Sequence, residues 1–187
     1  MRITGGILRG RRLAAFRGAD IRPTSDRVRE AIFNLLGSSL EGARVLDLFS
    51  GTGSLGIEAL SRGAVLAMFI DHSFKAIELT KKNLKICGLE DSGVVLRKDL
   101  AAGEPFDHPS LMRGFSLVFL DPPYGKGLIL PILHALQKGD FLAGTALVVA
   151  QSEKKQDLPD AVGNLKKGKA RTYGSTRIII FKHGEES

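Results

Sequence analysis

The segment whose residue types most clearly suit catalysis or binding is Asp121-Pro122-Pro123-Tyr124, which follows the apolar run 115–120. The run predicts a buried strand that ends in an acid, a rigid corner and an aromatic ring. Proline has no N–H group and a fixed φ. The proline carbonyls and the Asp121 carboxylate can therefore meet a ligand only as acceptors, while Tyr124 offers a flat stacking face. These groups suit a planar molecule with an –NH2 group, such as a nucleobase; the structural alternative is a proline-rich turn.

A glycine-rich turn is the second candidate site. Residues 45–56 predict an apolar strand, a turn and the start of a helix, and Gly51, Gly53 and Gly56 satisfy the pattern G-x-G-x-x-G. Glycines at these places allow a tight turn and a close approach of a ligand to the backbone. Asp71 ends the next apolar run, 20 residues after Gly51. This spacing suits a carboxylate that binds ribose hydroxyls.

Nicotinamide and adenosylmethionine sites both fit this pattern, and Asp47 separates them in part. It lies four residues before Gly51, where a pyrophosphate would meet a negative charge and a cation would be attracted. Adenosylmethionine carries a sulfonium and an ammonium group. The structural alternative is that Asp47 caps the following helix. Because Asp47, the glycine turn, Asp71 and the Asp121 corner occur in this order on one chain, the pattern favours adenosylmethionine.

Composition excludes several classes of protein. The chain has 187 residues, 43% hydrophobic and 25% charged, as expected for one globular domain with a full core. It has no apolar stretch of the ~18 residues that a membrane span needs, and no signal-peptide core is expected. Cys87 is the only cysteine, so we expect no internal disulfide and a cytoplasmic location. The histidines lack metal-ligand spacing, so no metal site is expected.

Positive charge is concentrated near the N-terminus. Residues 1–29 hold eight arginines, no lysine and two acids, a net charge of +6 out of +7 for the whole chain. A basic arm on a nearly neutral body is typical of a surface that binds phosphate, which arginine grips with a planar fork. We therefore expect a nucleic acid partner, contacted by Arg9, Arg11, Arg12 and Arg22. A solvated basic surface is the alternative.

Strand and helix patterns alternate along the chain and predict an α/β fold, with a seven-stranded, mostly parallel sheet and helices on both faces. The strands are expected at 44–49, 65–70, 93–97, 115–120, 145–150, 165–173 and 176–182. The helices are expected at 53–62, 73–87 and 127–138, after a first helix that begins near Pro23 and stops at Gly37. The predicted strands end in the acids Asp47, Asp71, Asp99 and Asp121. Ligands bind beyond the carboxyl ends of strands in such folds, although turn-forming acids explain one or two of the four.

The first residues are predicted to form an arm. Residues 2–18 indicate a short pair of strands in which Gly5-Gly6 supplies a flexible turn. The result is a basic β-hairpin arm over 1–22, followed by a catalytic core over 23–183, within a single domain.

With these motifs in place, the chain resembles the class I adenosylmethionine-dependent methyltransferases, which have a Rossmann-like fold. More closely, it is similar to the bacterial family that methylates N2 of one guanine, guanine 966, in 16S ribosomal RNA. The glycine turn marks only the superfamily, whereas the arginine segment around Pro23 and Thr24 is specific to the narrower family. The resemblance covers nearly the whole chain and is carried by residues 2–6, 9–11, 22–30, 47–53, 56–63 and 121–124.

The resemblance implies S-adenosylmethionine as cofactor and a role for each motif. The ribose would be held by Asp71, and the adenine would be met by Asp99 and the amide of Leu100. The implied partner is 16S ribosomal RNA or the assembling 30S subunit, and a monomer is expected. The methionine end of the cofactor would be held by Asp47, Phe49, Ser50, Gly51, Thr52 and Gly53.

The implied reaction is methyl transfer to an exocyclic amine. Asp121 and the Pro122 carbonyl would accept the hydrogens of the amine and direct its lone pair toward the methyl group, with Pro123 completing the rigid corner. Tyr124 would stack on a base taken out of its helix or loop.

Other substrates and classes stay open. The same corner occurs in adenine-N6 DNA methyltransferases and, with asparagine first, in glutamine methyltransferases of release factors. DNA enzymes usually add a target-recognition domain, for which 187 residues leave no room. A nicotinamide-dependent oxidoreductase would leave Asp47 unexplained, and a non-catalytic RNA-binding module would leave the cofactor acids unexplained.

Overall fold

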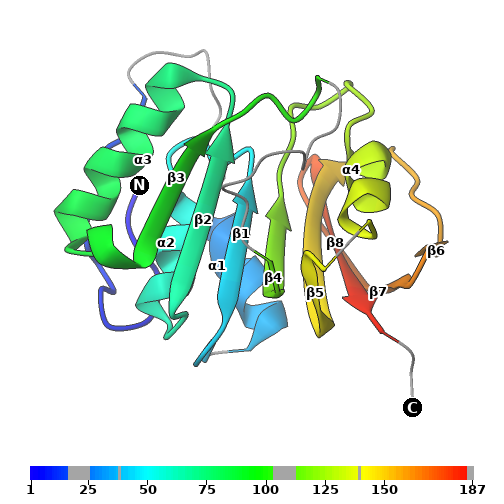
Figure 1. The fold of residues 1–187 in the computed structure, drawn as a ribbon, viewed down its shortest axis with the longest axis horizontal. Coiled ribbons are helices and arrows are strands. Elements are labelled where there is room, and N and C mark those ends of the chain that lie inside the picture. The colour runs from blue at the N-terminus through cyan, green and yellow to red at the C-terminus, as the bar shows by residue number, and fades with distance from the viewer. Residues whose placement is uncertain (17–25, 38, 103–112, 139, 185–187) are drawn as a thin grey trace. The chain divides into compact units, whose positions relative to one another are not determined.

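The structure is a computed structural model that describes residues 1–16, 26–37, 39–102, 113–138 and 140–184. By their contacts the residues divide into two compact units, Met1–Lys98 and Asp99–Ser187. In Figure 1 the first unit runs from blue to green and the second from green to red. The described residues form eight strands, one more than predicted, and four α-helices.

The first unit is built on a parallel sheet with the strand order β3-β2-β1. Its strands are β1 (Arg44–Leu48), β2 (Leu66–Asp71) and β3 (Gly93–Arg97). Its helices are α1 (Asp26–Leu36), α2 (Ser54–Ser61) and α3 (Phe74–Cys87), followed by a short 3-10 helix (Glu90–Ser92). Successive residues such as Val45 and Leu46 are both fully buried, which explains why β1 and β2 are apolar without alternation.

The second unit is a mixed sheet with the strand order β4-β5-β8-β7-β6. β4 and β5 are parallel, whereas the β5–β8, β8–β7 and β7–β6 pairs are antiparallel. The strands are β4 (Phe115–Leu120), β5 (Leu142–Glu153), β6 (Ala161–Val162), β7 (Leu165–Tyr173) and β8 (Thr176–His183), and the helix is α4 (Ile129–Leu136).

Several elements of the second unit differ from the prediction. β6 was not predicted, because two residues are too few to show an alternating pattern. β5 extends beyond 145–150 as far as Glu153, which is paired with Thr176 on β8. The helix predicted at 127–138 begins at Ile129, after Gly127 with its left-handed φ of 65°.

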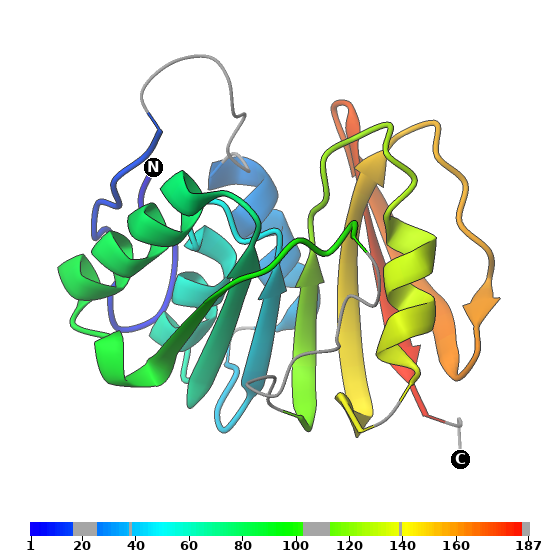
Figure 2. The same cartoon turned by 45° about the horizontal axis from the view of Figure 1, so that its top comes forward.

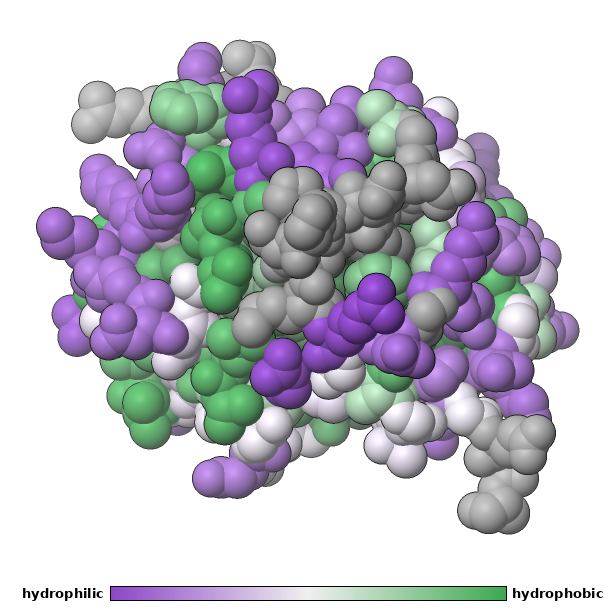
Figure 3. Space-filling view, in the orientation of Figure 1, coloured by the Kyte–Doolittle hydropathy of each residue, from purple (hydrophilic) through white to green (hydrophobic). Residues whose placement is uncertain are grey.

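α3 matches its predicted bounds because both of its ends carry capping residues. The Ser73 hydroxyl accepts a hydrogen bond from Ala76 N (3.4 Å), and Gly88 ends the helix in the left-handed conformation. Figure 3 shows hydrophilic side chains over the outer side of α3. As predicted, the charged residues of this helix are exposed: Lys75, Glu78, Lys81, Lys82 and Lys85.

The described part of the arm, residues 1–16, folds back on itself as predicted, but over a shorter stretch than two full strands. It makes a single antiparallel bridge, Arg2↔Arg12, beside which Ile3 N donates to the carbonyl oxygen of Arg11 (3.0 Å). The arm also docks on α2, as Figure 2 shows. Gly6 has a φ of 76°, and a Cβ there would lie 1.8 Å from the carbonyl oxygen of Ser61. Gly6 lies in a turn as predicted, since its carbonyl oxygen accepts a hydrogen bond from Arg9 N (3.2 Å). It is needed in addition for close contact with α2, which the sequence did not predict.

No helix in the described ranges is long and apolar enough to cross a membrane, since even α3 has only 14 residues.

Candidate active site

The glycine turn between β1 and α2 is held in place by Asp71 at the end of β2. Asp71 is 7% exposed. Its Oδ2 atom accepts a hydrogen bond from Gly51 N (2.9 Å), and its Oδ1 atom accepts one from Ser73 N (2.9 Å). Ser50 N donates to the carbonyl oxygen of Ile70 (3.0 Å). Asp71, predicted as a ribose ligand, thus also fixes the turn and the start of α3.

Asp47 is buried within β1, beside the start of α2. Its Oδ2 atom accepts a hydrogen bond from Gly56 N (2.9 Å), so the predicted helix-capping role is present. A Cβ on Gly56 would lie 2.3 Å from the ring of Phe69 and 3.2 Å from the Asp47 carboxylate. The third glycine of the motif is therefore needed for the close packing of helix against strand.

Phe49, in the glycine turn, has a strained backbone conformation that the sequence did not reveal. Its φ is 62°, and it is the only non-glycine residue with a positive φ in the described ranges. The left-handed region costs a residue with a Cβ about 1–2 kcal/mol, whereas Gly51 and Gly53 adopt it without that cost. Such strain is concentrated at functional sites.

Asn83 on α3 connects the glycine turn to the arm. Its Nδ2 atom donates to the carbonyl oxygens of Thr52 (2.8 Å) and Ala14 (3.1 Å), and its Oδ1 atom accepts from Ala14 N (2.8 Å). The Thr80 hydroxyl donates to the Gly51 carbonyl (3.2 Å). Asn83 and Thr80 are both fully buried. Sequence reasoning missed both, because their role depends on tertiary contacts.

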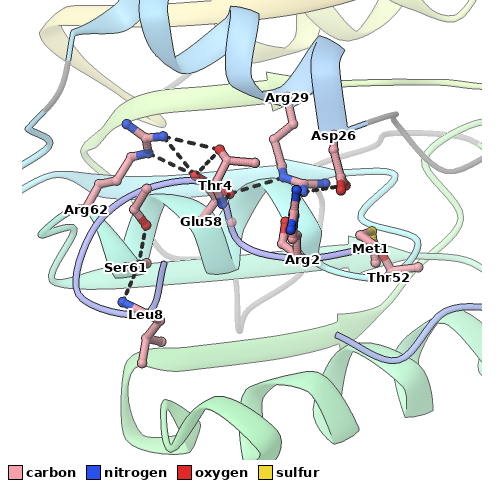
Figure 4. A network of polar contacts seen from close by, with 12 residues as sticks. Met1, Arg2, Thr4, Leu8, Asp26, Arg29, Thr52, Glu58, Ser61 and Arg62 are labelled. Atoms are coloured by element: carbon pink, nitrogen blue, oxygen red, sulfur yellow. Dashed lines mark hydrogen bonds and ion pairs between the residues drawn. The ribbon is translucent and has the colours of Figure 1, made fainter. Parts of the chain in front are cut away.

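A buried ion-pair network anchors the arm further. Glu58 on α2 is fully buried and accepts hydrogen bonds from Thr4 N (2.8 Å) and from the Thr4 hydroxyl (2.7 Å). It also pairs with Arg29 Nε (3.1 Å) and with Arg62 Nη2 (2.9 Å). Arg29 in addition pairs with Asp26 at 2.8 Å. Figure 4 shows these side chains converging on Glu58 from the arm, α1 and α2.

This network corrects the predicted basic arm. Arg29 was counted among the phosphate-binding charges, yet it is fully buried and neutralised by Glu58. Arg9, Arg11 and Arg12 are exposed, as RNA contacts need to be. Arg22, the fourth predicted contact, lies outside the described residues.

The second unit carries the remaining predicted residues. Asp99 is exposed, and its Oδ1 atom accepts a hydrogen bond from Ala101 N (2.9 Å). Leu100 is 4% exposed, so its side chain belongs to the core and only its backbone suits the predicted adenine contact.

The Asp-Pro-Pro-Tyr corner follows β4 directly. Asp121 is partly exposed, Pro122 is buried, and Pro123 is exposed. The Tyr124 side chain is 41% exposed, and its hydroxyl lies 2.8 Å from the hydroxyl of Thr176 at the start of β8. This hydrogen bond fixes the edge of the ring and leaves part of its surface available for stacking.

Within the first unit the structure brings together Asp47, the glycine turn and Asp71. Within the second it brings the Asp121 corner beside the turn between β7 and β8. In the described ranges, no group of three or more His, Cys, Asp or Glu residues could hold a metal ion.

Comparisons with known proteins identify the family of this chain. The family model described as conserved hypothetical protein 95 matches residues 1–182. YlbH of Bacillus subtilis is 41% identical over 184 residues, 97% of this chain and 98% of that protein. Ribosomal RNA small subunit methyltransferase D of Escherichia coli K12 is 32% identical over 182 residues, 97% of this chain and 89% of that protein.

A solved structure shows that the likeness extends to the fold. The protein yhhF from Escherichia coli has a TM-score of 0.84 at 31% identity, over 100% of this chain and 99% of that chain. The predicted Rossmann-like methyltransferase fold is confirmed. The chain belongs to the conserved hypothetical protein 95 family, which is the family of the ribosomal RNA small subunit methyltransferases D.

Proposed function

We propose that this protein transfers the methyl group of S-adenosylmethionine to N2 of guanine 966 in 16S ribosomal RNA. Membership of an rRNA methyltransferase family supports the coarser activity and the cofactor. The observation that carries the finer proposal is the Asp121 corner, where a carboxylate and two prolines directly precede an aromatic ring whose hydroxyl lies 2.8 Å from that of Thr176. In this proposal the enzyme works in the cytoplasm as a monomer, without a metal ion.

The glycine turn fits the cofactor in two respects. The Ser50 hydroxyl is buried and has no hydrogen-bond partner in the described part of the chain, as expected for a group that meets a ligand. A Cβ on Gly51 would have only the Phe49 carbonyl oxygen within 4.0 Å. The backbone is therefore open to a ligand at the residue that Asp71 holds.

Asp71 can bind ribose without releasing the turn. Each of its oxygens accepts one backbone N–H, but an ionised carboxylate has about four lone-pair sites. Ribose hydroxyls can take the remaining sites. Asp47, buried at the other side of the turn, supplies negative charge toward the ammonium group of the cofactor.

The cofactor would supply an electrophilic methyl group on a sulfonium sulfur. Asp121 and the Pro122 carbonyl orient the amine, whose lone pair is otherwise delocalised into the ring. The amine nitrogen would take this methyl group and leave a neutral thioether behind, and the proton that the nitrogen then loses would pass to the Asp121 carboxylate or to water. Positioning of this kind supplies roughly 7–11 kcal/mol in well-oriented systems, and fixed acceptors stabilise the charge that develops on nitrogen. Stacking on Tyr124 contributes about 1–3 kcal/mol per base.

The test is methylation by the purified protein of deproteinised 16S RNA and, separately, of small-subunit particles. Mass spectrometry of the digested RNA should find N2-methylguanine at one position. Asp121→Ala should keep cofactor affinity and lose most methyl transfer, because its acceptor acts mainly in the transition state. Asp91→Ala, an exposed acid on the 3-10 helix, is the matched control. Methylation of adenine, or no methylation of either substrate, would contradict the proposal.

A further inference from the structure

A second basic surface lies on the antiparallel strands of the second unit. Residues 154–183 hold eight lysines and arginines and two acids, a net charge of +6. The prediction of a nearly neutral body averaged this segment with residues 30–153, which hold 11 basic and 14 acidic residues, and with Glu185 and Glu186 at the C-terminus. The charge of the chain is therefore concentrated in two segments, of which the sequence reasoning found one.

The two acids of this segment neutralise only two of its bases. Lys167 Nζ lies 2.6 Å from Asp160 Oδ1, and its hydrogen bond holds the pKa of the Asp160 carboxyl below the usual value. Arg177 Nη1 lies 3.8 Å from Asp157 Oδ1. The other six have no acidic partner within the described ranges; they are Lys154, Lys155, Lys166, Lys169, Arg171 and Lys182.

Strand register places three of these on one face. Lys166 lies directly opposite Lys182, and Arg171 lies opposite Ile178, four residues before Lys182 on β8. Opposite residues of an antiparallel pair share a face, and so do alternate residues along a strand. Lys166, Arg171 and Lys182 are all exposed. Like charges directly opposite each other destabilise a sheet, so the fold alone gives no reason for the lysine pair.

The same face leads to the methyl-transfer corner. Thr176 lies two residues before Ile178 on this face of β8, and its hydroxyl holds Tyr124 at 2.8 Å. At roughly 3.3 Å per residue, the rows of Arg171 and of the lysine pair lie about 7 and 20 Å from Thr176 along the strand. On β8 the residues of this face between Thr176 and Lys182 are Ile178 and Ile180, which are buried. The exposed positive charge of the face therefore comes from Arg171 and Lys166 on β7 and from Lys182 near the end of β8.

We propose that this β7–β8 basic face (Lys166, Arg171 and Lys182) binds the phosphate backbone of the RNA that flanks the methylated guanine. The inference rests on the proposed function and adds a docking surface to it. Phosphates match the face because each carries a negative charge that an exposed lysine or arginine can neutralise. The β7–β8 basic face provides affinity and fixes the position of the RNA on the protein, while the Asp121 corner selects the base.

The test is RNA affinity as a function of salt for the triple variant Lys166→Gln, Arg171→Gln and Lys182→Gln. Each lost phosphate contact lowers the log–log slope by about 0.7–0.9. Wild-type affinity should therefore fall roughly 20–40-fold more than that of the variant between 50 and 200 mM salt. The KM for RNA should rise while kcat stays unchanged. A variant of α3 (Lys75→Gln, Lys82→Gln and Lys85→Gln) carries the same charge change on another exposed surface.

An unchanged slope in a folded triple variant would overturn the proposal, and so would an equal change in the α3 variant. Weaker binding to small-subunit particles with unchanged binding to deproteinised RNA would overturn it in favour of a ribosomal protein as the partner. The salt slope needs no catalysis. If the wild-type protein methylated no RNA, the proposed function would fail while the face could still be tested by binding.

Discussion

Replacing Glu58 by alanine should destabilise the protein more than most single substitutions, although Glu58 is assigned no part in the chemistry. The carboxylate accepts hydrogen bonds from the backbone and side chain of Thr4 and from the guanidinium groups of Arg29 and Arg62. The substitution leaves Arg29 in its buried position, where Asp26 and the carbonyl oxygen of Arg2 are its remaining partners among the described residues.

The magnitude follows from the burial of both partners. Glu58 and Arg29 have fully buried side chains, and removal of one member of such a pair costs about 3–5 kcal/mol, because the other charge stays buried. The bonds to Thr4 would each add about 0.5–1.5 kcal/mol, but bonds to one shared carboxylate are not additive. We therefore expect the free energy of unfolding to fall by about 3–5 kcal/mol.

Denaturant unfolding at neutral pH measures this change, and thermal unfolding should show a melting temperature lower by roughly 6–20 °C. Glu78→Ala is the control, because Glu78 forms an exposed pair with Lys81 on α3, and its loss should change stability by no more than ~0.5 kcal/mol. Tryptic cleavage after the arginines of the arm should also become faster in Glu58→Ala, because Thr4 no longer holds the arm. A loss below 1 kcal/mol, or cleavage at the wild-type rate, would refute the role of Glu58 as the anchor of the arm.

Three further predictions concern the ribose-binding role of Asp71, the arginines of the arm and the burial of Cys87. Asp71→Ala should weaken cofactor binding about 10–100-fold in calorimetry, since hydrogen bonds to a charged acceptor are worth ~1.5–3 kcal/mol; unchanged affinity would remove the ribose assignment. Neutralising Arg9, Arg11 and Arg12 together should lower the salt slope of RNA binding by about 0.7–0.9 per lost contact and leave cofactor affinity unchanged, whereas an unchanged slope would make the arm a solvated surface. Burial raises the pKa of the Cys87 thiol, with a smaller opposing effect of Arg11, so a smaller fraction of the thiol is ionised at pH 8. Labelling of Cys87 by a thiol reagent should therefore be slower in the folded than in the unfolded protein. Equal labelling rates would show that the thiol is accessible.

The sequence predicted elements whose signals are local. Ser73 and Gly88 mark both ends of α3, and the glycine pattern marks the turn before α2. The four predicted strand-end acids lie within or just after β1, β2, β3 and β4. Each of these features depends on residues only a few positions apart, so it can be predicted without knowing the tertiary contacts.

The sequence could not predict features that depend on distant partners. Arg29 and Glu58 are 29 residues apart, and Thr4 and Glu58 are 54 apart. Charged residues are normally exposed, so a buried cluster has no local signature. The β7–β8 basic face was missed for another reason: it lies in a segment whose charge cancels when averaged over the rest of the chain.

The strain at Phe49 and the docking of the arm have one physical basis. A turn that holds a non-glycine residue in the left-handed region needs contacts that fix it on several sides. Asp71 fixes Gly51 from β2, and Asn83 fixes the Thr52 carbonyl from α3. The same Asn83 amide also binds both backbone groups of Ala14. Because Asn83 is fully buried, leaving these groups unpaired would cost about 1–3 kcal/mol each. The arm therefore stays docked whenever the turn is formed, and its exposed arginines project from a backbone at a fixed distance from the glycine turn rather than from a flexible tether.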